Sequence, residues 1–210
     1  MPTESAPPRQ SYHHGSLREA LLEAGLELTR TGGPGALVLR DVTRRVGVSP
    51  NAAYRHFADR DSLLAAVAIR IQQGMVERMG DQLPPAPVDR AGAARAQLSA
   101  VGLGYIGFAL KEPGWFEVAF AEIDGLPAAA TDDGPAPLRW LVDALDRLVA
   151  SGELAAEARA GAEWPCWSAV HGFALLALKG PLRSQPPELV WSSAQRTVDT
   201  IITGLLTPAA

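Results

Sequence analysis

Residues 39–64 of the chain read LRDVTRRVGVSPNAAYRHFADRDSLL, a stretch that contains two short helical patterns joined by a turn. The first pattern stops at Gly47, a residue type that commonly follows the end of a helix. The second begins with Ser49 as N-cap and Pro50 at the first helical position, and it ends near Phe57. Two short helices around such a turn predict a helix-turn-helix, in which the second helix enters the major groove of DNA.

The rest of the chain predicts an all-α protein, because apolar residues recur at helical spacing and no β-hairpin signal occurs. We expect a mobile arm over residues 1–11, a three-helix helix-turn-helix domain over 12–60, and a C-terminal helical bundle over 61–210 that senses a ligand and dimerises. Pro165 is expected either to kink a helix or to begin a new one. Helices are expected over residues 16–31, 39–46, 49–57, 59–83, 88–111, 113–123, 138–151, 155–179 and 188–206.

Composition restricts the class and location of the protein. Apolar residues make up 47% of the 210 residues and charged residues 20%, values that are typical of a soluble globular protein. No apolar run is long enough to span a membrane, and the first residues lack a signal-peptide pattern, so we expect a cytoplasmic protein without membrane contact. Cys166 is the only cysteine, which excludes an intrachain disulfide and a cysteine-rich zinc site and indicates a buried free thiol.

The net charge of −4 is unevenly distributed along the chain. Residues 1–62 contain eight arginines and seven acidic residues, whereas residues 63–210 contain eleven basic and sixteen acidic residues. Such asymmetry is expected when phosphate contacts are confined to one domain. Double-stranded DNA is therefore the partner that we expect for the N-terminal part.

The first residues of the second helix in the pair are expected to face base edges in the major groove. These residues are Pro50, Asn51 and Ala52. Asn51 can make a paired donor and acceptor contact to adenine, and Ala52 can touch a thymine methyl group. Arg55 lies in the same helix and reaches either a base or a phosphate. Arg44 in the preceding helix either contacts the DNA backbone or belongs to a solvated face.

Three ordered segments carry a family resemblance: LRDV at 39–42, VGVS at 46–49 and YRHF at 54–57, the last of which is followed by a Leu-Leu pair at 63–64. Together with YHHGSLR at 12–18, they resemble the DNA-binding domain of the TetR family of transcriptional regulators. The resemblance covers about a quarter of the chain. It implies operator DNA as the partner of this domain.

The resemblance also implies roles for individual residues. Tyr54, His56 and Arg60 would approach DNA phosphates, with a core position as the alternative for Tyr54. Val38 departs from the family pattern, because a Thr or Ser usually opens the second helix there, and the lost cap costs about 1 kcal/mol if nothing replaces it. Thr43 stands where an alanine is usual. The residues expected to bind DNA are Arg40, Arg44, Ser49, Pro50, Asn51, Ala52, Tyr54, Arg55, His56 and Arg60.

Aromatic residues of the C-terminal part predict a site for an apolar or aromatic small-molecule effector. Four of the five tryptophans, Trp164 among them, are expected in the bundle interior. The motif from Trp167 to Gly172 resembles the Trp-His-Gly signature of one branch of TetR-type C-terminal domains. His171 is either a core residue bonded to a carbonyl or a pocket residue that holds the effector. The residues expected to line the site are Tyr105, Phe108, Trp115, Phe116, Phe120, Trp140, Trp167 and His171.

The last two helices are expected to carry more apolar surface than one bundle needs, including Phe173, Ala174, Ala177 and Val198. The resemblance implies a homodimer through these helices, which suits palindromic DNA. The predicted function is a transcriptional repressor that a small effector releases from its operator. A C-terminal domain that binds a protein partner is the alternative.

No enzyme and no cofactor are predicted, because the chain has no glycine-rich phosphate loop, no nucleophile elbow and no framed pair of carboxylates. The adjacent residues His13 and His14 lack the helical i, i+4 spacing of a metal site, and no acidic residue or cysteine is spaced to complete a ligand set. We therefore expect no metal.

Overall fold

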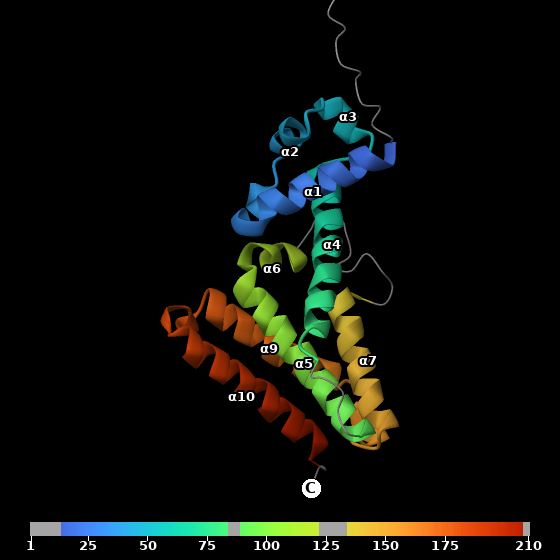
Figure 1. The fold of residues 1–210 in the computed structure, drawn as a ribbon, viewed down its shortest axis with the longest axis vertical. Coiled ribbons are helices and arrows are strands. Elements are labelled where there is room, and N and C mark those ends of the chain that lie inside the picture. Colours follow the sequence, from blue (N-terminus) through green and yellow to red (C-terminus); the bar gives the residue numbers. More distant parts are fainter. Residues whose placement is uncertain (1–13, 84–88, 122–133, 208–210) are drawn as a thin grey trace, which may run out of the picture.

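The computed structural model describes residues 14–83, 89–121 and 134–207, and every regular element in these ranges is a helix, which confirms the all-α class. Figure 1 shows α1 to α3 at one end of an elongated molecule and the later helices at the other. None of the helices in these ranges is long and apolar enough to cross a membrane. The predicted arm over 1–11, His13 and the side chain of His14 lie outside the described part.

The α-helices, with two short 3₁₀ turns between them, are as follows. They are α1 (His14–Gly32), α2 (Leu39–Val46), α3 (Pro50–Tyr54), α4 (Arg60–Gly80), α5 (Arg90–Lys111), α6 (Pro113–Ala119), α7 (Ala136–Ala150), α8 (Ala156–Arg159), α9 (Glu163–Leu178) and α10 (Pro187–Leu206), and the 3₁₀ turns are η1 (Pro34–Ala36) and η2 (Pro181–Ser184).

The predicted signals set the bounds of the helix-turn-helix. α2 ends because Gly47 adopts the left-handed conformation at φ 77° and its N–H bonds back to the last turn. Ser49 begins α3, because its hydroxyl accepts a hydrogen bond from the N–H of Ala52 at 3.3 Å. α3 is shorter than predicted: it ends at Tyr54, and Phe57 lies beyond its last turn.

Helix α4 joins the two ends of the molecule. Asp59 and Ser62 form a reciprocal capping box at its start, which fixes the direction in which the helix leaves the helix-turn-helix. Figure 1 shows α4 running from there into the C-terminal bundle, and it packs against α1, α5, α6 and α7. Its apolar residues recur at helical spacing and are buried: Leu63, Leu64, Val67, Ile71, Met75 and Met79.

Helix α5 is the central element of the C-terminal bundle and packs against α4, α7, α9 and α10. Two glycines permit this close packing. A Cβ atom at Gly104 would lie 2.6 Å from the Cα of Met79, and one at Gly102 would lie 2.9 Å from a methyl group of Val198. Any larger side chain at these positions would therefore push α4 or α10 away from α5.

The expectations for the last helices were partly wrong. Of the two alternatives for Pro165, the second is confirmed: α8 ends first, and Pro165 is the third residue of a new helix, α9, where its missing N–H removes no intrahelical bond. A single helix over 155–179 is therefore wrong. Trp164 is 59% exposed instead of lying in the bundle interior. The apolar residues expected to be surplus are divided. Four of them are buried within the chain itself, Phe173, Ala174, Ala177 and Val198, and the other four are partly buried, Val170, Ile201, Ile202 and Leu205.

Candidate functional site

The end of the molecule formed by α2 and α3 presents most of the residues predicted to bind DNA. Ala52 and His56 are partly buried, and the others on the two helices and the turn are exposed. Tyr54, for which a core position was the alternative, has 53% of its surface exposed. The exposed residues of this set are Arg40, Arg44, Ser49, Pro50, Asn51, Tyr54 and Arg55.

The opposite side of the same segment is anchored in the core. Ala53 is fully buried and Phe57, which follows the short helix, is 4% exposed, so both belong to the hydrophobic core beneath this segment. The guanidinium of Arg18 lies over the Phe57 ring at 5.1 Å. Because α3 is anchored through these two residues, its polar face is free to enter a groove.

Two of the predicted arginines have intramolecular partners. Arg44 forms an exposed ion pair with Asp41 at 2.9 Å, which costs little to exchange for a phosphate. Arg60 donates from Nε to the carbonyl of Leu37 at 2.9 Å, and its other nitrogens bond to Pro34 and Asp61. Arg60 thus ties the start of α4 to the α1–α2 connection.

The two departures from the family pattern have local consequences. Val38 stands at the N-cap of α2, makes no side-chain cap bond and is 46% exposed. Thr43 is buried, and its hydroxyl donates to the carbonyl of Arg40 at 3.0 Å. The α2 helix has therefore lost one cap, while Thr43 is accommodated without an unpaired hydroxyl.

A cluster of five rings connects α5, α6 and α9 in the C-terminal domain. Tyr105 is fully buried at its centre, and its hydroxyl lies 2.8 Å from Nδ1 of His171. The Tyr105 ring also contacts Phe116, Phe120 and Trp167, with centroids between 5.2 and 5.7 Å apart. Burial raises the pKa of Tyr105 and lowers the pKa of His171, so both side chains are neutral near neutral pH.

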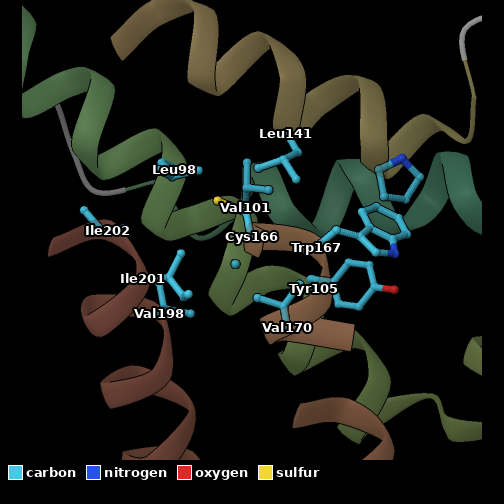
Figure 2. Close-up of a pocket in the computed structure, with 12 residues that line it drawn as sticks. Leu98, Val101, Tyr105, Leu141, Cys166, Trp167, Val170, Val198, Ile201 and Ile202 are labelled. Atoms are coloured by element: carbon cyan, nitrogen blue, oxygen red, sulfur yellow. The ribbon is translucent and has the colours of Figure 1, made fainter. Parts of the chain in front are cut away.

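An apolar cavity of about 30 Å³ lies on one side of this cluster, between α5, α7, α9 and α10 (Figure 2). Tyr105 and Trp167 face it, as does Cys166. Burial raises the pKa of the Cys166 thiol to about 11, so the thiol is protonated and poorly nucleophilic near neutral pH. The remaining lining is aliphatic apart from Pro137 and Gly102: Leu98, Val101, Leu141, Val170, Val198, Ile201 and Ile202.

A larger cleft of about 490 Å³ lies on the other side, between the helix-turn-helix and the C-terminal domain. Phe116, Phe120 and His171 line it, so the structure divides the predicted ligand residues between two spaces. The cleft also contains three charged residues that the sequence did not single out as a group. They are Arg60 from the start of α4, Glu117 from α6 and Lys179 from the end of α9.

The other predicted ligand residues lie elsewhere. Trp115 faces α1, where its indole N–H donates to the carbonyl of Leu26 at 2.8 Å. Phe108 lies beside Arg78 on α4 at 5.5 Å from guanidinium to ring centroid. Trp140 packs partly buried against the core. None of the three lines either of the two spaces beside Tyr105, but Phe108 and Trp115 line a third, open space of about 550 Å³. Most of the other side chains that line this third space are charged or polar.

Sequence reasoning missed an ion-pair cluster around the buried carboxylate of Glu112, at the junction of α1, α4 and α5. Glu112 accepts two hydrogen bonds from Arg30, at 2.8 and 2.7 Å, and a third from Arg78 at 3.2 Å. Both guanidinium groups also lie over the Trp115 ring, at 5.0 and 5.7 Å. The hydrogen bond from Arg30 holds the pKa of Glu112 below its ordinary value. We call Glu112, Arg30, Arg78 and Trp115 the interdomain clamp.

No group of three or more potential metal ligands occurs among the described side chains.

Comparison with known proteins identifies the two domains. Residues 21–67 match the family described as bacterial regulatory proteins, tetR family, and residues 98–201 match the tetracyclin repressor-like C-terminal domain.

Curated transcriptional regulators match either most of the chain or about half of it. The HTH-type transcriptional regulator YobS of Bacillus subtilis is 22% identical over 192 residues, which cover 91% of this chain and 94% of the relative. The HTH-type transcriptional repressor Rv3405c of Mycobacterium tuberculosis is 28% identical over 93 residues, which cover 43% of this chain and 50% of the relative. These relatives are regulators of transcription, not enzymes, as predicted for this chain.

Solved structures share the fold. A Rhodococcus sp. RHA1 protein of unknown function has a TM-score of 0.73 at 28% identity, covering 95% of this chain and 100% of that one. A TetR variant from Acinetobacter baumannii AYE, solved in complex with minocycline, has a TM-score of 0.60 at 17% identity, covering 94% and 100%. The two matched domains, in this order and on this fold, place the chain in the TetR family of bacterial transcriptional regulators.

Proposed function

We propose that the chain acts as a homodimeric repressor that binds a palindromic operator and is released by a small molecule bound to its C-terminal domain. The observation that carries the DNA-binding part is the exposed face of α2 and α3, which is anchored behind by Ala53 and Phe57. The repressor part is supported by one relative, the transcriptional repressor of Mycobacterium tuberculosis, whose match covers 43% of this chain.

The bases would be read by the first turn of α3. The residues at its N-terminus are exposed. Asn51 lies on this helix and Arg55 directly follows it, and both are exposed. Asn51 suits adenine and Arg55 suits guanine or a phosphate. Ser49, Tyr54 and His56, with Arg40 and Arg44 on α2, would contact phosphates. Arg60 acts by positioning α4 instead, because three of its N–H groups bond within the chain.

The dimer would form through the outward faces of α9 and α10. The outward face of α9 leaves room for a second helix at Gly172, because a Cβ atom there would meet nothing within 4 Å. Leu176 on α9 and Leu189 on α10 are both 47% exposed and would be buried by a partner. A two-fold axis here would present two α3 helices to the two halves of a palindromic operator.

The interdomain clamp is the structural connection through which an effector would act. It joins the end of α1 to the α5–α6 junction and to α4, so a displacement of α6 is transmitted to the helix-turn-helix. A coupling of about 1–3 kcal/mol between the two sites would weaken operator binding roughly 5- to 150-fold.

The DNA-binding proposal is tested by selecting bound sequences from a random DNA library and then measuring affinity for the selected operator by fluorescence anisotropy. We expect Asn51→Ala and Arg55→Ala each to weaken operator binding by roughly 5- to 150-fold, because each removes a contact worth about 1–3 kcal/mol. Arg183→Ala is the matched control, since Arg183 is exposed near the start of α10. If a palindromic operator is selected and both Asn51→Ala and Arg55→Ala bind it with unchanged affinity, the bases are read by a surface other than α3.

A further inference from the structure

We infer that the cleft between the helix-turn-helix and the C-terminal domain is the effector site, and that its ligand is a planar aromatic molecule bearing a carboxylate. This inference rests on the proposed function, because it names where the effector binds and what its chemistry is. It differs from the expectation that the effector occupies the bundle core.

Size favours the cleft over the core cavity, the other space beside Tyr105. The third space, of about 550 Å³ beside Phe108 and Trp115, is lined by three acidic and two basic side chains, so it suits a carboxylate less well. The core cavity of about 30 Å³ holds a water molecule at most, and its aliphatic lining offers a water too few polar partners. The cleft of about 490 Å³ falls within the range of roughly 300–1,000 Å³ that is usual for small-molecule sites. A ligand of two fused rings therefore fits the cleft without rearrangement, whereas the core would have to open.

The apolar walls of the cleft favour a flat ring. Phe116 and Phe120 lie with centroids 5.1 Å apart, and the His171 ring lies 5.6 and 5.4 Å from them. Leu64 and Leu175 line the same space. Aromatic rings prefer the offset and edge contacts that such a group of rings offers.

His171 supplies a directed hydrogen-bond donor. The Tyr105 hydroxyl is buried, and among the described residues its only hydrogen-bond partner is Nδ1 of His171, so the Tyr105 hydroxyl donates and Nδ1 accepts. The proton of the neutral imidazole is then on Nε2. His171 is half-buried at the wall of the cleft, and an oxygen acceptor on the ligand would satisfy this N–H.

The unused hydrogen-bond donors of the cleft favour an anion. Both cations that line the cleft have an acidic partner, since Lys179 pairs with Glu117 at 3.0 Å on the exposed rim and Arg60 pairs with Asp61 at 2.8 Å. Arg60 still keeps two of its five N–H donors beyond its three intramolecular bonds. A ligand carboxylate would accept from these donors, so it would be held by charge-assisted hydrogen bonds and not by an excess of positive charge.

A ligand here would contact both domains at once. Pro34, Gly35 and Arg60 belong to the helix-turn-helix side, and Glu117 and His171 belong to the C-terminal side. A Cβ atom at Gly33 would lie 2.8 Å from the Glu117 carboxylate, so the two sides already touch at the edge of the cleft. Occupancy therefore changes the contacts that fix the helix-turn-helix relative to the bundle.

The test uses two probes of matched shape, 2-naphthoate and 2-naphthylmethylamine, titrated into the full-length protein by isothermal titration calorimetry. We expect the carboxylate to bind and the amine to bind at least roughly tenfold more weakly, because the amine offers no acceptor and meets two cations. His171→Phe keeps a ring but removes the N–H, and Lys179→Gln removes a charge at the rim of the cleft. Each should weaken the binding of 2-naphthoate by roughly three- to tenfold. Val198→Ala enlarges the core cavity and should leave the affinity unchanged.

Equal binding of both probes, or carboxylate binding that is insensitive to His171→Phe and Lys179→Gln, would overturn the inference. Tighter binding in Val198→Ala would overturn it as well, because the ligand would then lie in the core. Operator affinity of the ligand-free protein and of each variant is measured in parallel and shows that the variants are folded. If the protein binds its operator but not 2-naphthoate, only the cleft assignment fails; if it binds no DNA, the proposed function fails.

Discussion

At the scale of single residues, Glu112 links the C-terminal domain to α1 through Arg30. Its side chain is 9% exposed, and its carboxylate is held by guanidinium groups from α1 and α4. A buried carboxylate is stable only when its partners are present, because desolvation of an unpaired charge costs several kcal/mol. The clamp therefore makes the position of α1 depend on the position of α5 and α6.

Glu112→Gln tests this dependence through stability. We expect the variant to lose about 2 kcal/mol of unfolding free energy at about pH 7, because the three charge-assisted hydrogen bonds to Glu112 are weakened or lost. Because Arg30 lowers the pKa of Glu112 in the folded state, the wild-type contribution is fully present above the ordinary pKa of 4.5 and is lost as the pH falls below it.

In urea unfolding, the difference in free energy between wild type and Glu112→Gln should therefore stay constant from about pH 7 to about pH 5.5 and narrow as the pH is lowered further to about 3. Glu77→Gln on α4 is the control, since Glu77 is exposed. A constant difference across this pH range would show that Glu112 does not act through its charge.

At the scale of secondary-structure elements, α2 is held without the cap that its position calls for. Val38 already has the extended conformation of an N-cap residue, with φ −110° and ψ 120°, and only its side chain is unsuitable. Val38→Ser should therefore stabilise the protein by about 1 kcal/mol, because the hydroxyl can accept an N–H of the first turn.

Val38→Ala is the matched control for this prediction, because it removes the same exposed apolar surface without adding an acceptor. The urea midpoint should rise in Val38→Ser by more than in Val38→Ala, with the slope of the transition unchanged. A midpoint for the serine variant at or below that of the alanine variant would show that another group already satisfies the helix start.

The elements also differ in how far the sequence predicts them. Gly47, Ser49 and Asp59 act on backbone groups within four residues, so the bounds of α2 and the starts of α3 and α4 could be predicted locally. Glu112 could not be identified in this way, because Arg30 lies 82 residues away in sequence and the pairing depends on how α1 packs on α6. Contacts between distant helices are fixed by packing, which no local pattern encodes.

The same limit explains the division of the predicted ligand residues. Their aromatic character predicts burial, and most of them are indeed partly or fully buried. Which space each ring faces depends on the rotation of its helix: Trp115 and Phe116 are neighbours on α6, yet Trp115 contacts α1 and Phe116 lines the cleft. Lys179 and Glu117 could be recognised as part of this site only once α6 and α9 were seen side by side.

At the scale of the whole molecule, the proposed dimer determines whether two α3 helices can reach successive grooves. Gly172→Glu is a sharp test, because the isolated chain has open space at this position and a helical glycine gains stability on replacement. A charged side chain in the centre of the α9 face would be buried without a partner in the dimer, at a cost of several kcal/mol. We expect Gly172→Glu to be a folded monomer by light scattering, with operator affinity reduced by at least roughly tenfold.

Gly74→Glu is the control. A side chain at Gly74 on α4 also meets open space and lies outside the proposed interface, so this variant should remain dimeric and bind the operator as wild type does. A dimeric Gly172→Glu protein with full operator affinity would place the dimer interface on another surface.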